Sequence, residues 1–101
     1  MQLRLLVAAG LGLLLVTNHS GASDVNLGRK IYQQHCVICH GDDGGGSMAG
    51  APDFKRGQGL MQSDQALLTR IRSGKNACPA FRGILDEQEV LDVIAYIRTL
   101  F

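Results

Sequence analysis

The clearest hydrophobic pattern lies at the end of the chain, where apolar residues recur every three or four positions between residues 90 and 100. These residues are Val90, Val93, Ile94, Ile97 and Leu100. Such spacing places apolar side chains on one face of a helix. Asp86 and Glu89 form a capping-box variant ahead of it, and Leu85 with Val90 forms a candidate hydrophobic staple. The pattern predicts a helix that starts after Asp86 and continues to the end of the chain.

Two further helices are predicted closer to the N-terminus. Asp24 can cap a first helix that runs from residue 25 to the sequence CVICH, with Leu27, Ile31 and Tyr32 on one side. Ser63 can cap a second helix over the sequence DQALLTRIRS, which Gly74 would end. In this second helix we expect Leu67, Leu68 and Ile71 to face inward and Arg70 and Arg72 to face solvent.

Between these two helices lies the sequence GDDGGGSMAG at residues 41–50, followed by Pro52. Glycine and proline at this density prevent a regular element, so we expect a flexible loop. The alternation of apolar and polar residues that is typical of strands is not found. The sequence therefore predicts an all-α fold.

The first 22 residues have the order of a secretory signal. A short basic start with Arg4 precedes an apolar run at residues 5–16, and small residues lead to Ala22. The run is shorter than the roughly 20 residues of a membrane span. We expect residues 1–22 to be a signal peptide cleaved after Ala22 and residues 23–101 to form one domain. An uncleaved anchor is the alternative.

The remaining domain is too small to depend on its apolar core alone. Without the 22 signal residues, 79 of the 101 residues remain. Domains of this size usually need a disulfide framework, a metal or a cofactor. Cys36, Cys39 and Cys78 are the only cysteines, and three thiols cannot form two disulfides. We therefore expect a metal or a cofactor to stabilise the fold.

The sequence CVICH at residues 36–40 predicts a covalent attachment site for a c-type haem. Thiols separated by two intervening residues, here Cys36 and Cys39, can be presented by one turn of backbone to the same edge of the porphyrin. His40 follows directly and is carried under the iron as its proximal ligand. A large apolar macrocycle would also supply the core that so short a chain lacks.

Two other kinds of site use similar residues. A thioredoxin-like redox pair has the same CxxC spacing, but it follows a strand in an α/β pattern, whereas the residues before Cys36 are helical. A structural zinc site needs a second pair of Cys or His ligands at matching spacing, and the sequence has no such pair. Haem attachment is the better interpretation of the motif.

Together these features resemble a class I cytochrome c in its short bacterial form. The resemblance lies in GRKIY at residues 28–32 leading to CVICHG, in PDF at residues 52–54 after the glycine-rich loop, and in the ending PAFRGILDEQEVLDVIAYIRTL. It implies a small domain of three main helices and loops packed around one covalently attached haem c. It also implies that the first and last helices cross at right angles, with Gly28 and Tyr96 at the crossing.

The chain departs from that family at one position. Where the family has a methionine before PAF as the second axial ligand, this sequence has Cys78. By resemblance Cys78 is the distal ligand, and a thiolate there would favour ferric iron and lower the reduction potential. Two alternatives stay open. Met61 or Met48 supplies the ligand instead, or no side chain binds and Cys78 is a free thiol able to link two chains.

A haem with both axial positions filled has no open site for a substrate, so we expect a periplasmic one-electron carrier of low potential and not an enzyme. One alternative is a subunit or enzyme of haem-thiolate sulfur oxidation, or of peroxide or gas chemistry at an open distal site. Another is a factor for haem delivery to, or maturation of, a periplasmic haem enzyme such as nitrite reductase.

The charge balance bears on the partners. Loss of Arg4 with the signal leaves nine basic residues, since 10 − 1 = 9, against nine acidic ones. This balance argues against nucleic acid and against a polybasic membrane patch. We expect larger periplasmic or membrane-bound redox proteins as partners, and membrane association only if the signal is uncleaved. The protein is expected to be a monomer, with a Cys78-linked dimer as the alternative. His35 is expected to lie at the surface of the domain.

Overall fold

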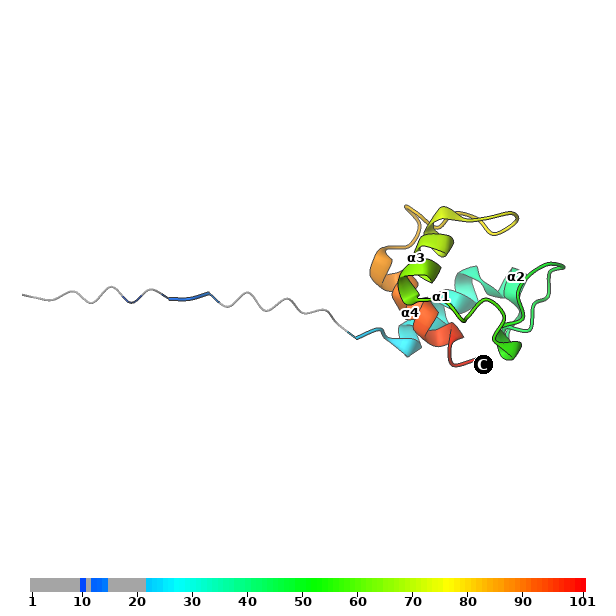
Figure 1. Cartoon of the computed structure of the whole chain (residues 1–101), viewed down its shortest axis with the longest axis horizontal. Coiled ribbons are helices and arrows are strands. Elements are labelled where there is room, and N and C mark those ends of the chain that lie inside the picture. The colour runs from blue at the N-terminus through cyan, green and yellow to red at the C-terminus, as the bar shows by residue number, and fades with distance from the viewer. Residues whose placement is uncertain (1–9, 11, 15–21) are drawn as a thin grey trace, which may run out of the picture.

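The computed structural model describes residues 10, 12–14 and 22–101 (Figure 1). Most of the predicted signal peptide, residues 1–9, 11 and 15–21, lies outside the described residues. The helices are α1 (Val25–His35), α2 (Val37–His40), the 3-10 turn η1 (Phe54–Arg56), α3 (Asp64–Ser73) and α4 (Glu87–Ile97). Residues 22–101 contain no strand, only two isolated bridges. The expected all-α domain with three main helices is therefore confirmed.

Each main helix begins at a side chain that caps it, as the sequence predicted. The Asp24 carboxylate accepts hydrogen bonds from the amides of residues 26 and 27, and the Ser63 hydroxyl accepts one from residue 66. At α4, Asp86 and Glu89 form a full capping box, each side chain bonding to the backbone of the other. These bonds satisfy amides that a helix leaves free in its first turn.

Helix α4 crosses α1 at a very short distance (Figure 1). Gly28 is buried in α1 where the carbonyl of Asp92 in α4 lies, and a Cβ atom on Gly28 would overlap that carbonyl. One turn further along, Tyr32 is fully buried and its ring packs edge-on against Tyr96 at 5.3 Å between centroids. The expectation that Gly28 and Tyr96 lie at the helix crossing is confirmed.

The apolar core has two parts, and α4 contributes to both. One part joins α3 to α4 and contains Leu67, Leu68, Phe81, Leu85, Val90 and Ile94. The other lies where α1 meets α4 and contains Tyr32, Phe54, Leu60, Val93 and Ile97.

Within residues 22–101 no helix is long and apolar enough to cross a membrane.

One expectation about the core is wrong. Leu27 was placed on the inner side of the first helix, but its side chain is 48% exposed. The side of α1 that meets α4 is set by Gly28 and Tyr32, which are four residues apart and lie on one face. Leu27 is one residue before Gly28 and is therefore turned about 100° away from that face.

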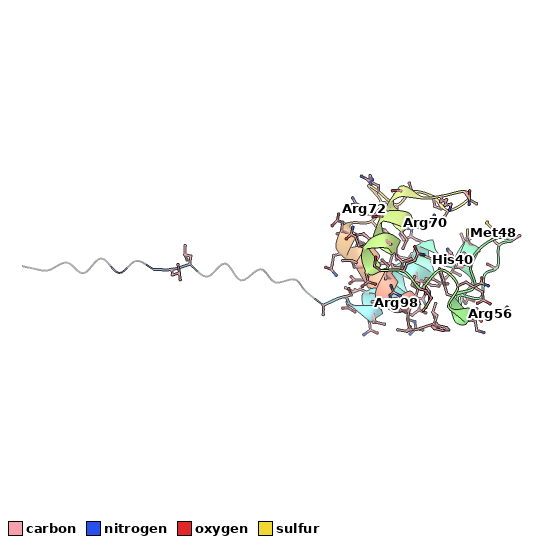
Figure 2. The ribbon with its side chains drawn as sticks, viewed as in Figure 1. His40, Met48, Arg56, Arg70, Arg72 and Arg98 are labelled. Atoms are coloured by element: carbon pink, nitrogen blue, oxygen red, sulfur yellow. The ribbon has the colours of Figure 1, made fainter. Side chains whose placement is uncertain are left out.

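The loop before α3 is tied to the end of α4 by Arg98, labelled in Figure 2. The guanidinium donates to the carboxylate of Asp64 and to the carbonyls of Leu60 and Gln62, at 2.7 to 3.0 Å. One side chain thus connects the end of α4 to the segment that leads into α3. Planar guanidinium groups suit such multiple contacts because their donors are fixed in direction.

The helix crossing can be tested with Gly28→Ala. The added methyl group meets backbone rather than a movable side chain, so we expect a loss of about 1–3 kcal/mol in the free energy of unfolding. Guanidinium denaturation of the purified protein measures it. Gln33→Ala, on an exposed position of the same helix, is the control. Equal stability of the two variants would contradict the close crossing.

Candidate functional site

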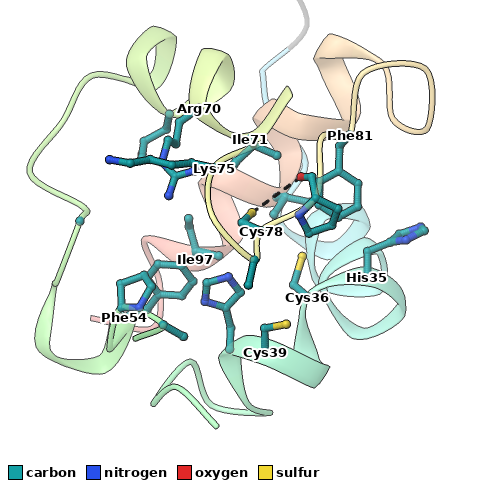
Figure 3. Close-up of a pocket in the computed structure, with 18 of the residues that line it drawn as sticks. His35, Cys36, Cys39, Phe54, Arg70, Ile71, Lys75, Cys78, Phe81 and Ile97 are labelled. Carbon is teal, nitrogen blue, oxygen red and sulfur yellow. Dashed lines mark hydrogen bonds between the residues drawn. The ribbon is translucent and has the colours of Figure 1, made fainter. Parts of the chain in front are cut away.

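A cavity of about 720 Å³ lies between the α2 turn, helix α3 and the segment that carries Cys78 (Figure 3). Its volume is within the range of about 300–1,000 Å³ that is usual for cofactor sites. All residues of the predicted attachment site that carry chemistry line it, namely Cys36, Cys39, His40 and Cys78. Its other walls are mainly apolar and include Phe54, Leu67, Ile71, Phe81 and Ile97.

The attachment motif occupies a break between two helices. Helix α1 ends at His35, Cys36 is its C-cap, and α2 begins at Val37. The amide of His40 donates to the carbonyl of Cys36 at 2.9 Å, which closes a single helical turn. Cys36, Cys39 and His40 are all half-buried at the cavity, whereas Ile38, between the two cysteines, is 84% exposed. The turn therefore directs both thiols and the imidazole to one side.

The imidazole of His40 lies in an apolar setting. Its ring stacks on Phe54 at 4.6 Å between centroids with 16° between the planes. Burial lowers the pKa of His40, and the positive charge of Arg70 lowers it further. The side chain is therefore kept neutral, which is the form that binds a metal. Its Nδ1 atom is buried and has no hydrogen-bond partner among the described residues.

The loop at residues 41–50 contains no regular element, as predicted, and its backbone folds onto the motif. The amide of Gly46 donates to the carbonyl of His40 at 2.8 Å, and those of Ser47 and Met48 donate to the carbonyl of Cys39. From the other side the hydroxyl of Tyr32 donates to the carbonyl of Gly41 at 2.6 Å. These contacts satisfy the carbonyls at the end of α2 and hold the motif in place.

Cys78 is carried by a tight turn over the cavity. The amide of Lys75 donates to the carbonyl of Cys78 and that of Cys78 donates to Lys75, both at 3.0 Å. Asn76 within the turn has a φ of 54°, a conformation that Asn tolerates better than most residues. The next residues are anchored because the amide of Phe81 donates to the carbonyl of Ile71 at the end of α3. The half-buried Cys78 side chain lines the cavity beside the α2 turn (Figure 3).

Gly74 allows this turn to come so close to α3. Its φ is +71°, and a Cβ atom there would lie 2.7 to 2.8 Å from the backbone of residues 78–80. Real side chains do not make such contacts, so only glycine fits between the helix end and the Cys78 segment. The sequence reading of Gly74 as a helix stop is correct, and the structure adds this second role.

The three thiols share one environment. Burial raises the pKa of the Cys36 thiol to about 12, and the neighbouring Cys78 and Cys39 thiols add to the shift. None of the three forms a disulfide. Among the described residues, no group of three or more Cys, His, Asp or Glu side chains is arranged to hold a metal ion by itself.

The two methionines named as alternative ligands lie in different surroundings. Met61 is 89% exposed and does not line the cavity. Met48 does line it, from the glycine-rich loop, and is 41% exposed (Figure 2). His35 is exposed as expected, and its ring meets Phe81 edge-on at 5.8 Å between centroids, at the margin of the cavity.

The expectation that Arg70 and Arg72 both face solvent is wrong. Both are half-buried on α3, and Arg70 lines the cavity (Figures 2 and 3). The Nη1 atom of Arg72 pairs with Glu87 at 2.8 Å, although its Nε atom is buried without a partner among the described residues. The Nη1 atom of Arg70 is also buried without such a partner, and Arg70 forms no ion pair with the described residues. The reason is helical spacing, because Arg70 lies three residues after Leu67, at the edge of the buried face. The apolar pattern of the helix alone did not indicate that Arg70 lines the cavity.

These residues fit a covalently bound haem. Two thiols on one helical turn, a neutral imidazole directly after them and apolar walls correspond to the parts that such a group requires. The guanidinium of Arg70, with its Nη1 atom buried and unpartnered, suits the propionates, which are the anionic groups of a haem. A small all-α domain with this site is a c-type cytochrome.

Comparison with known proteins agrees with this class. Residues 23–97 match the family described as cytochrome c oxidase, cbb3-type, subunit III. Cytochrome c6 of Thermosynechococcus vestitus is 35% identical over 80 residues, covering 75% of this chain and 70% of that protein. Cytochrome c6 of Parathermosynechococcus lividus is 34% identical over 79 residues, covering 74% of this chain and 88% of that protein. The chain belongs to this cytochrome c family and is a monohaem c-type cytochrome related to cytochrome c6.

The hydrogen bond from the Tyr32 hydroxyl to the Gly41 carbonyl can be tested with Tyr32→Phe. Removal of the hydroxyl leaves the Gly41 carbonyl without its donor, so we expect the free energy of unfolding of the haem-loaded protein to fall by about 1–2 kcal/mol. Guanidinium denaturation measures the loss. Tyr96→Phe is the matched control, because Tyr96 is half-buried and packs on Tyr32. A Tyr96 variant that loses as much would show that the Tyr32 bond is not the reason.

Proposed function

We propose that the protein is a one-electron carrier that holds one haem c through Cys36 and Cys39, with His40 as proximal and Cys78 as distal ligand. The observation that carries the proposal is that all four side chains line one cavity of suitable size, on elements that approach it from different sides. Relationship to cytochrome c6 supports a carrier rather than an enzyme. With both axial positions filled, no site for a substrate remains.

When bound, the haem supplies the one-electron centre, and the residues of the chain hold and shield it. The neutral imidazole of His40 offers a lone pair on one face, with its ring orientation fixed by Phe54. The turn at residues 75–78 offers the Cys78 sulfur from another direction. Leu67, Ile71 and Phe81 keep water away, so that little solvent reorganises when the charge changes.

Cys78 sets the redox range in this proposal. A thiolate carries its own negative charge and stabilises ferric over ferrous iron, so the reduction potential falls compared with a methionine ligand. Axial ligands span about 0.8 V in haem proteins. The proposed protein therefore works at low potential, with larger redox proteins as partners, in the periplasm to which the N-terminal segment directs it.

The ligand assignment is tested by low-temperature electron paramagnetic resonance of the ferric protein beside Cys78→Met. We expect a low-spin signal with the narrow anisotropy of thiolate ligation, lost in the variant. The midpoint potential of the variant should rise by a sizeable part of the roughly 0.8 V range. Met61→Leu is the control and should change neither measurement, because Met61 is outside the cavity.

A different result would separate the alternatives. A high-spin signal that Cys78→Met leaves unchanged would mean that Cys78 is not bound to the iron. Carbon monoxide binding to the ferrous protein would then identify an open distal face, and the carrier proposal with His40/Cys78 ligation would be abandoned.

The role of Arg70 gives a second test, by potentiometric titration of Arg70→Gln. Loss of a positive charge beside the haem destabilises the added electron, so we expect the midpoint potential to fall by on the order of tens of millivolts. Arg72→Gln is the matched control on the same helix, since the Arg72 guanidinium pairs with Glu87. If both variants shift the potential equally, Arg70 has no special position at the haem.

A further inference from the structure

One buried carboxylate, that of Asp92 on α4, has no cation to balance it in the part of the chain that the structure describes. Asp92 is 4% exposed and is the only charged residue among residues 22–101 that is buried. The ion pairs found within those residues use other carboxylates. Burial of a carboxylate costs free energy unless hydrogen bonds and an opposite charge compensate for it. A cation beside Asp92 would therefore stabilise the fold.

Asp92 holds the first turn of α1. Its Oδ1 atom accepts a hydrogen bond from the backbone amide of Asp24 at 2.8 Å and another from the side-chain amide of Gln88 at 3.0 Å. Its backbone carbonyl lies against Gly28, one turn further along α1. Both donors to the carboxylate are neutral groups. The bond from Asp24 places the backbone that directly precedes α1 beside this carboxylate.

The expected cleavage site of the signal peptide falls at the same place. Cleavage after Ala22 makes Ser23 the first residue, so that a new α-ammonium group lies one residue before Asp24. Bond lengths limit the distance between consecutive backbone nitrogens to about 3.7 Å. With the 2.8 Å bond from Asp24 added, the ammonium nitrogen is at most about 6.5 Å from Oδ1 of Asp92. Rotation about the backbone of Ser23 can bring the two charges closer.

We propose that the Asp92 carboxylate is the binding site for the N-terminal ammonium group that signal cleavage creates at Ser23. In the precursor this nitrogen belongs to a neutral peptide bond, so the charge pair forms only after cleavage. Removal of residues 1–22 then completes the contact that holds α1 against α4. The inference rests on the proposed function only for export and cleavage, since the haem ligands have no part in it.

The pairing predicts a raised pKa for the Ser23 ammonium group, and the surroundings make this a specific sign. The N-terminus of α1 carries a partial positive charge, which by itself would lower that pKa. Hydrogen bonds bring two carboxylates to this place, Asp24 from α1 and Asp92 from α4. The Asp24 carboxylate already accepts the amides of residues 26 and 27. A variant without the charge of Asp92 separates the contributions of the two carboxylates.

The experiment uses the full chain, expressed with its signal in a bacterium that exports and matures c-type cytochromes. The purified protein is labelled with trace acetic anhydride across a pH range, digested with trypsin and analysed by mass spectrometry. The tryptic peptide of residues 23–29 contains no lysine, so its α-amine is the only amine to be labelled. An uncleaved chain would give residues 5–29 instead. We expect a labelling midpoint about one pH unit higher in the native protein than in guanidinium.

Asp92→Asn should abolish this rise, because asparagine keeps the size of the side chain and an oxygen acceptor but carries no charge. Asp42→Asn removes the same charge from the exposed loop at residues 41–50 and should retain the rise. Two glycines inserted between Ala22 and Ser23 provide a variant that leaves the domain unchanged. They move the ammonium group by up to about 7 Å and should reduce the rise.

Three results would overturn the proposal. The first is a mature chain that does not begin at Ser23, and the second is a native midpoint equal to that in guanidinium. The third is a rise that survives Asp92→Asn or, if that variant does not accumulate, one that the glycine insertion leaves unchanged. Covalent haem staining of the same preparation judges the proposed function separately. Absence of haem would contradict that function, whatever the titration of the Ser23 amine.

Discussion

The close crossing of α1 and α4 is the contact on which the other parts depend. Because Gly28 has no side chain, α1 rests on the backbone of α4 at Asp92. That position buries Tyr32 one turn later, and the Tyr32 hydroxyl reaches the carbonyl of Gly41. Gly41 directly follows His40. The helix crossing therefore fixes the end of the attachment motif through the side chain of Tyr32. The site of this small domain is thus positioned by backbone contact rather than by a large core.

The part of the site that carries Cys78 depends on another glycine. Gly74 ends α3 and lets the backbone of residues 78–80 pass against the helix end. The bond from the Phe81 amide to Ile71 then fixes the segment on its other side. The cavity lies between the two halves, since α1 carries the motif and α3 carries the Cys78 segment, and at its margin His35 contacts Phe81. A group that fills the cavity would therefore join the two parts of the core.

The sequence allowed the helices to be predicted well, because their signals are local. Asp24, Ser63 and Asp86 cap the helices that they were expected to cap, and the stripe of α4 is buried. Leu27 and Arg70 were misplaced because their surroundings depend on which side of a helix another element covers. Periodicity defines an apolar face, but the cavity beside α3 and the crossing at Gly28 arise from tertiary packing. Cys78 was singled out in the sequence by its place before PAF, and the structure places its side chain at the cavity.

The cysteine before PAF changes what the proposed distal position offers to iron. A methionine at residue 78 could bind iron but could not carry charge. A cysteine there offers a strong anionic donor to the proposed haem site. Its placement depends on the turn that Gly74 and Phe81 hold against α3. In the proposed function the same turn therefore determines both the distal ligand and the redox range.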